Sequence, residues 1–269
     1  MKDKFYGSLK QTAVHDDIDL HVEEISIKGY SVVTGLIDAE SLDSWRERID
    51  DIYLRQEADF GKDELARIQE TDACRAPLLY DLDFVKLAAH PKVLSIVDRI
   101  LGDWYILNLQ NAVINRPETE HHQSSWHRDL PHQNFVISQP LAINALYAID
   151  DFSELSGGTC ILPLSHKTEV LPSDEYIERN QLSVVMPAGS AVVFDSMLLH
   201  RAGVNKGNSI RRALNHLYTR PILKQQYDFP RALGDQINLD SRTEQLLGYT
   251  SQVPVDDKAW RHARARRMG

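Results

Sequence analysis

The chain has 269 residues with a hydrophobic content of 42%, and its formal net charge at pH 7 is −9. This composition can form a sizeable buried core, and the negative charge argues against nucleic acid and anionic membranes as partners. Two cysteines do not suggest a disulfide framework, and neither a signal-peptide-like segment nor an apolar run of about 18 residues occurs, so we expect a cytoplasmic protein.

The N-terminal part of the chain is predicted to supply one strand and two amphipathic helices. A β-branched segment between glycines, residues 29–36, indicates a short strand. After Asp38 apolar residues recur every three or four positions, which is typical of a helix that buries one face; they are Leu42, Trp45, Ile49 and Ile52. Residues 83–102 show the same pattern, whereas residues 60–80 carry no clear pattern. We expect both helices to buttress the fold.

The middle of the chain has the pattern of a β protein. Seven apolar segments, most of them bounded by turn residues, indicate strands at 104–114, around His127, and at 141–149, 159–164, 182–186, 191–199 and 210–218. No helical pattern separates them, so a sandwich or barrel is expected rather than a parallel sheet. The predicted fold class is mainly β with flanking helices (α+β).

The whole chain, residues 1–269, is predicted to form a single domain, because no internal repeat or Pro/Gly/Ser-rich linker interrupts it. Within it we expect an N-terminal strand and buttressing helices (1–103), a β core (104–222) and a helical tail (223–269). The end of the tail begins with acidic residues and finishes with four arginines, a distribution that suits a solvated helix.

Three residues of the β region form a candidate metal site. His127 and Asp129 are two positions apart, so on an extended strand both side chains project from the same face. His200 ends an apolar segment, and its ring nitrogens need polar partners there. Two imidazoles and one carboxylate form the facial triad that holds non-haem Fe(II). A lone histidine at a strand end is more often bonded to backbone or water, and His-x-Asp alone occurs by chance.

A pair of arginines offers a candidate anion site. Arg211 lies eleven residues after His200 on the next predicted strand, and Arg212 follows it. A guanidinium buried in a β core is costly unless it faces an anion, and its planar shape suits a carboxylate. Periodicity alone does not decide which of the two arginines points inward.

Four sequence motifs together resemble the phytanoyl-CoA dioxygenase family of Fe(II)/2-oxoglutarate oxygenases. The resemblance extends from about Gly29 to Tyr218. The motifs are Ile114-Asn115-Arg116-Pro117, Trp126-His127-Arg128-Asp129-Leu130, Gly157-Gly158-Thr159-Cys160-Ile161-Leu162-Pro163-Leu164-Ser165-His166-Lys167, and Leu199-His200-Arg201-Ala202-Gly203-Val204-Asn205 followed by Arg211.

The resemblance implies a double-stranded β-helix, which is a jelly-roll-like, cupin-like core. It also implies Fe(II) bound by His127, Asp129 and His200, with 2-oxoglutarate held by Arg211 and O2 as the oxidant. Gln110 shares the parity of Ala112 and Ile114 and is a candidate for a further bond to 2-oxoglutarate, as is Thr159. These six residues are the predicted catalytic, cofactor-binding and metal-binding residues.

The sequence departs from the family pattern at two positions. Arg128 stands between the metal ligands where Gln is common, and Leu164 stands where Gly is common. Neither position is a metal ligand, so the departures bear on other contacts rather than on the reaction class. Residues 116–123 and 165–180 are long enough to form a lid over the metal.

The expected activity is hydroxylation, or another oxidation, of a C–H bond in a small or medium-sized metabolite, with release of succinate and CO2. Asp129 occupies the position where related halogenases leave room for chloride, so halogenation is not expected. Two alternatives are a non-oxidative cupin-like isomerase or lyase that uses Mn or Zn, and a binding protein on a degenerate oxygenase fold. Arg211 argues against the first alternative and the intact triad against the second.

Overall fold

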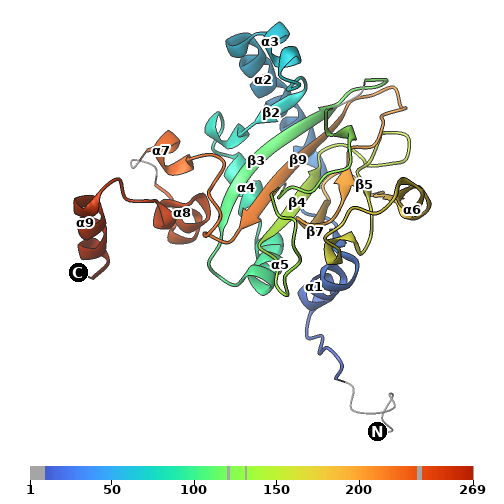
Figure 1. Ribbon diagram of the computed structural model, residues 1–269. Helices are drawn as coiled ribbons and strands as arrows, with labels where there is room; N and C mark the ends of the chain where they lie inside the picture. The colour runs from blue at the N-terminus through green and yellow to red at the C-terminus, as the bar shows by residue number, and fades with distance from the viewer. Residues whose placement is uncertain (1–9, 120–121, 131, 235–237, 269) are drawn as a thin grey trace.

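The computed structural model describes residues 10–119, 122–130, 132–234 and 238–268. Within these ranges no helix is long and apolar enough to cross a membrane. Figure 1 shows an antiparallel sheet at the centre, with helices around it and the C-terminal helix away from the body.

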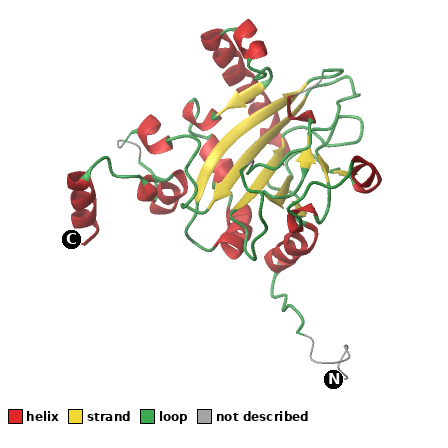
Figure 2. Cartoon of the chain, in the orientation of Figure 1, coloured by secondary structure: helices red, strands yellow, loops and turns green. Residues whose placement is uncertain are grey.

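Among the described residues, the main sheet has six strands, all paired antiparallel. Its order is β1 (Tyr30–Val33), β7 (Ala191–Asp195), β4 (Ala142–Ala148), β9 (Arg211–Thr219), β3 (Ile106–Asn115) and β2 (Ala73–Arg75). A smaller sheet contains β6 (Leu182–Ser183), β5 (Cys160–Ile161) and β8 (His200–Arg201). Figure 2 shows both sheets, which form the β core with flanking helices that the sequence predicts, although more of the described residues lie in helices than in strands.

Helices pack against one face of the main sheet. They are α1 (Asp17–Lys28), α2 (Leu42–Phe60), α4 (Phe84–Ala88) and α5 (Pro91–Leu101), and they form one continuous core with alternate side chains of the strands. Ile49, Phe84 and Ile96 are completely buried in it. Full burial of such a side chain stabilises the fold by about 1.5–3 kcal/mol, so this layer holds the sheet rigidly behind the site.

The opposite face of the main sheet meets the smaller sheet. Leu146, Phe194 and Ala213 of the main sheet pack with Ile161 and Met186 in a second core. Because side chains alternate along a strand, the faces divide by parity: odd residues of β9 and of β3 from Leu109 onward, and even residues of β4 and β7, point toward this second layer. The space between the two sheets contains the candidate site.

The remaining helices lie at the periphery. They are α3 (Lys62–Arg67), α6 (Asp174–Asn180), α7 (Phe229–Leu233), α8 (Ser241–Leu247) and α9 (Asp257–Met268), and the short 3-10 helices are Ala39–Ser41, Pro77–Leu79, His122–Ser124, Ser165–Lys167 and Tyr249–Ser251. Helix α8 packs on β3. Helix α9 extends from the body and corresponds to the helix predicted at the end of the tail (Figure 1).

The structure departs from several sequence expectations, and it assigns elements to a segment for which the sequence predicts none. The helix expected at 83–102 is divided into α4 and α5, because Pro91 cannot continue a helix and begins the second one. Residues 60–80, which carry no clear pattern, contain α3 and the edge strand β2. The strand expected around His127 is reduced to one bridge, in which the backbones of His127 and His200 exchange two hydrogen bonds.

Candidate active site

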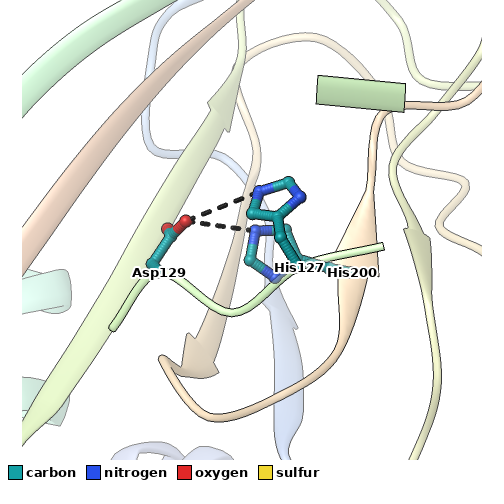
Figure 3. Close-up of side chains that lie close together, drawn as sticks. All are labelled: His127, Asp129 and His200. Atoms are coloured by element: carbon teal, nitrogen blue, oxygen red, sulfur yellow. Dashed lines mark ion pairs between the residues drawn. The ribbon is translucent and has the colours of Figure 1, made fainter. Parts of the chain in front are cut away.

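The structure brings His127, Asp129 and His200 together between the two sheets (Figure 3). His200 begins β8, and the backbone bridge places His127 beside it. Asp129 Oδ1 lies 3.6 Å from His127 Nε2 and 3.5 Å from His200 Nε2. One ligand atom from each residue lies within 4.8 Å of the others, a spacing that a single cation can bridge.

Both imidazole rings are oriented by backbone carbonyl groups. His127 Nδ1 lies 2.8 Å from the carbonyl oxygen of Ser125, and His200 Nδ1 lies 2.9 Å from that of Leu198. A carbonyl oxygen only accepts, so each Nδ1 carries the proton and donates it. Each Nε2 of the neutral ring then presents a lone pair toward Asp129. This is the arrangement of a metal-ligating histidine, whose other nitrogen is held by a second group.

Two asparagines hold the carboxylate. Asp129 Oδ2 accepts hydrogen bonds from Asn144 Nδ2 and Asn215 Nδ2, which leaves Oδ1 facing the imidazoles. Asn144 is itself fixed, because its Oδ1 accepts from Ser196 Oγ at 2.6 Å. Burial opposes ionisation of Asp129, but His200 and these donors outweigh it and lower its pKa to about 2. The carboxylate is therefore ionised at neutral pH.

The pKa values of the two imidazoles shift in opposite directions. Burial and the nearby His200 lower the pKa of His127. Burial also disfavours protonation of His200, but Asp129 outweighs burial and raises its pKa. A cation would bind the Nε2 lone pairs and the carboxylate in competition with protons, since metal ligands must be deprotonated. Two imidazoles and one carboxylate on one side of an open cavity fit non-haem Fe(II).

Arg211 lies in the same cavity as the three candidate ligands. It is 2% exposed, its Nη2 donates to the carbonyl oxygen of Gly157 at 2.7 Å, and its Cζ lies 4.7 Å from the centre of the Phe152 ring. Its Nε has no hydrogen-bond partner, and no carboxylate forms an ion pair with it in the described part of the chain. Burial lowers the pKa of Arg211 to about 10, so it remains a cation at neutral pH.

Arg212 points to the other side of the sheet. Its guanidinium forms ion pairs with Asp50 of α2 at 2.7 Å and with Asp150 at 3.0 Å. The alternation of β9 therefore answers the question that periodicity leaves open: Arg211 faces the cavity, and Arg212 joins the sheet to the helix layer.

The structure places the two other predicted co-substrate contacts in different environments. Thr159 is 4% exposed and lines the cavity with Arg211. Gln110 does not reach this cavity, so the expectation based on its parity needs correction. Its side chain bonds to the backbone of Leu78 and Phe84 and to His216, all on the helix side of the sheet. The even residues of β3 face the helices, and Gln110 is a core residue.

Sequence reasoning missed the asparagines that support Asp129. Asn144 lies inside Ala142-Ile143-Asn144-Ala145-Leu146, and Asn215 lies in Ala213-Leu214-Asn215-His216-Leu217, between apolar residues and a histidine. A polar side chain within an apolar strand must be hydrogen-bonded, so each was a detectable signal. Their common partner was not detectable, because only the pairing of β9 with β4 brings Asn144 and Asn215 together.

Arg128 connects the ligand-bearing segments. Its Nε donates to the carbonyl oxygen of Met197 at 3.0 Å, close to His200 in the chain. Its Nη2 donates to the carbonyl of Thr168 at 2.7 Å and its Nη1 to that of Glu169 at 3.1 Å. Gln has too few donors for these contacts. The departure from the family pattern at this position thus ties one candidate lid segment to the ligand loop.

Comparisons with known proteins are consistent with this site. The sequence profile of the phytanoyl-CoA dioxygenase family matches residues 26–213. The uncharacterized protein Rv1501 of Mycobacterium tuberculosis is 39% identical over 246 residues, which cover 88% of each chain. The chain belongs to the phytanoyl-CoA dioxygenase family. The family prediction is thereby confirmed, and with it the class of 2-oxoglutarate-dependent non-haem iron enzymes.

Two more distant proteins are informative about the fold. The dioxygenase olcK of Penicillium canescens is 26% identical over 263 residues, covering 90% of this chain and 83% of its own. The structure of the epimerase SnoN from nogalamycin biosynthesis, described in complex with Fe3+, alpha ketoglutarate and nogalamycin RO, superposes with a TM-score of 0.57 at 16% identity and covers 76% of this chain and 84% of its own. This likeness confirms the cupin-like double-stranded β-helix.

Proposed function

We propose that this family member hydroxylates, or otherwise oxidises, a C–H bond of a small or medium-sized metabolite and converts 2-oxoglutarate to succinate and CO2. The observation that carries the proposal is the cavity shared by the His127, Asp129 and His200 cluster and the buried Arg211. A metal ligand set and an unpaired cation on one cavity are suited to a co-substrate that has a chelating end and a distal carboxylate.

The residues take distinct roles in this proposal. His127 Nε2, His200 Nε2 and Asp129 Oδ1 hold the iron, and Arg211 binds the distal carboxylate of 2-oxoglutarate with Thr159 beside it. Phe194 and Leu146 line the same space and exclude water from it. Iron supplies the chemistry that couples decarboxylation of 2-oxoglutarate to oxidation of the substrate, and the protein supplies orientation and a dry cavity.

Family membership argues against the alternative of a non-oxidative isomerase or lyase that uses Mn or Zn, and the surroundings of Arg211 argue against it independently. Such an enzyme has no need for a buried guanidinium without an ion-pair partner, because the cost of burying that charge is recovered only when an anion binds. Arg211 therefore favours the oxygenase.

The proposal predicts different consequences for the two neighbouring arginines. Arg211→Ala should weaken 2-oxoglutarate binding roughly a hundredfold or more, because it removes a charge-assisted contact to the carboxylate. Arg212→Ala should leave that affinity unchanged and lower stability, since its partners are Asp50 and Asp150. Titration of 2-oxoglutarate into the Mn(II)-loaded variants measures both affinities. An unchanged affinity in Arg211→Ala would contradict the proposal.

A further inference from the structure

The cavity extends from the candidate metal ligands along the face of β3 that carries Leu109, Asn111 and Val113, and Arg211 does not line this part. This extension has a volume of about 340 Å3, and His127, Asp129 and Asn215 form its inner end while Asn111 and Arg75 lie on its wall. The volume is in the lower part of the range for small-molecule sites. Arg211, the proposed site of 2-oxoglutarate, lines the other part of the cavity. The extension is therefore free to accept the substrate that is oxidised.

Asn111 is held there in a fixed orientation. Its Oδ1 accepts from the backbone N–H of Ala76 at 3.2 Å and from Tyr227 Oη at 2.9 Å. The Ala76 N–H also donates to the carbonyl oxygen of Gln110 at 2.9 Å, and an amide turned around would place its NH2 group against this N–H, so the observed orientation of Asn111 is preferred. Its Nδ2 is thereby left as a donor on the wall of the cavity, and no hydrogen bond from this nitrogen is found among the described residues.

The position of Asn111 relative to the metal ligands follows from strand register. Asn111 of β3 lies directly opposite Asn215 of β9, and Asn215 Nδ2 donates to Asp129 at 3.2 Å. Side chains paired in this way have Cβ atoms about 5 Å apart. The Asn111 donor is therefore one strand spacing from a residue that contacts a metal ligand, a separation that one small ring of a substrate can span.

The charge of this wall is balanced. Arg75 forms a two-point ion pair with Glu70, so its guanidinium is not left to attract an anion. Leu109 and Val113 flank Asn111 on the same face of β3 and offer apolar contact. The wall thus combines two apolar side chains, one neutral amide donor and a neutralised arginine.

We propose that this wall binds an uncharged, oxygenated substrate, whose hydroxyl or carbonyl oxygen accepts a hydrogen bond from Asn111 Nδ2 while its carbon skeleton packs on Leu109 and Val113. The inference rests on the proposed function, because it assigns the substrate class of the same site. A carboxylate or an acyl-CoA phosphate would find no unpaired cation on this wall among the described residues. A plain alkyl chain would leave the buried amide donor without a partner, which is costly.

The test uses the iron-loaded protein and a matched panel of compounds: cyclic alcohols and ketones, the corresponding hydrocarbons, the corresponding carboxylates, and palmitoyl-CoA. Succinate formation above the rate without added compound measures which class is accepted. We expect stimulation by the alcohols or ketones. Binding of the best compound to the Mn(II)- and 2-oxoglutarate-loaded protein, measured by calorimetry, provides a second measurement that is independent of turnover.

Two variants isolate the amide. Asn111→Asp keeps the acceptor for Ala76 and Tyr227 but replaces the donor with an acceptor, so the affinity for the best compound should fall roughly ten- to hundredfold. The affinity for 2-oxoglutarate should be unchanged. Asn108→Asp is the matched control, because Asn108 is a buried amide of the same strand whose bonds go to Thr219, Lys224 and Gln226. It should retain the affinity of the unmodified protein for the compound.

The outcomes separate the two proposals. A protein that binds neither Mn(II) nor 2-oxoglutarate would contradict the proposed function. A protein that converts 2-oxoglutarate, but is stimulated only by carboxylates, hydrocarbons or palmitoyl-CoA, would overturn the substrate class alone. An unchanged compound affinity in Asn111→Asp would likewise overturn the assignment of Asn111.

Discussion

At the scale of single residues, Leu164 has a backbone conformation that its side chain disfavours. Its φ is 68°, in the left-handed region, and its side chain is 52% exposed. Leu164 precedes the 3-10 helix Ser165–Lys167. Its backbone N–H donates to the carbonyl oxygen of Lys28 at 2.9 Å, and this bond holds the turn in place. The family preference for Gly here has a physical reason, since Gly adopts this conformation without steric cost.

Leu164→Gly should therefore stabilise the protein. Relief of the left-handed conformation gains about 1–2 kcal/mol, and the greater freedom of Gly in the unfolded chain removes part of it, so we expect a gain of about 0.5–1 kcal/mol. The midpoint of urea unfolding measures this. Leu155→Gly, at another exposed leucine without a positive φ, should lower stability. A loss of stability in Leu164→Gly would show that its side chain contacts outweigh the strain.

The residue scale also shows what sequence can predict about the site. His127, Asp129, His200 and Arg211 were predicted because their residue types and spacing are characteristic of the chemistry. Asn111 was not predicted, because the role proposed for it depends on the strand opposite it and on Tyr227, which lies 116 positions away in the chain. Gln110 was predicted to face the cavity, but even-numbered residues in this part of β3 face the helices. A difference of one residue in the alternation moves a side chain to the other face of a sheet.

At the scale of structural elements, the ligand loop is stabilised by side chains rather than by a strand. Residues 127–129 pair with β8 through a single bridge, and the only further backbone bond found for this segment among the described residues runs from the Asp129 N–H to the carbonyl oxygen of Ser196 at 3.2 Å. Arg128 adds bonds to the segment that leads to His200 and to residues 168–169. We call these Arg128 hydrogen bonds the clasp, and we expect them to position the metal ligands and to limit the movement of the 165–180 segment.

Arg128→Met should weaken metal binding by roughly ten- to hundredfold, because outer contacts of a metal site commonly have effects of this size. Titration with Mn(II) measures the affinity without turnover. Arg220→Met provides the control, since Arg220 also bonds a loop carbonyl, that of Pro140, but contacts no ligand-bearing segment. Equal Mn(II) affinity in the Arg128 and Arg220 variants would argue against the clasp.

Prediction of the elements succeeded where packing follows a simple period. Helix α2 and strand β3 were predicted because one buried face, or a long apolar run, leaves a clear pattern. The edge strand β2 has only three residues, too few to show a period. The segment around His127 was predicted as a strand, but it forms only one bridge. Over two or three residues, the sequence pattern of a single bridge is the same as that of a regular strand.

At the scale of the whole molecule, the stability should depend on one buried carboxyl group. Asp195 at the end of β7 is 9% exposed, and burial raises its pKa to about 6, although the N–H of Met197 donates to it at 2.9 Å. In the unfolded chain its pKa is near the ordinary value of 3.8. The folded protein thus binds this proton more tightly, and folding stability falls as pH rises from about 4 to 6.

Asp195→Asn should remove this dependence while keeping an acceptor for Met197. The stability advantage of the variant should be near zero at pH 4 and reach about 2–3 kcal/mol at pH 7, because each pKa unit corresponds to about 1.4 kcal/mol. Urea unfolding of both proteins across this range measures the difference. A constant difference over the whole pH range would show that Asp195 does not titrate there.

The most direct test of the account is the iron content of the protein after anaerobic loading with Fe(II). The unmodified chain should retain one iron, and so should His132→Ala, which replaces an exposed histidine near the ligand loop. His200→Ala should retain almost none and form no succinate, because it removes one of three ligand atoms that lie within 4.8 Å of one another. Stoichiometric iron and normal succinate formation in His200→Ala would contradict the metal site and the function built on it.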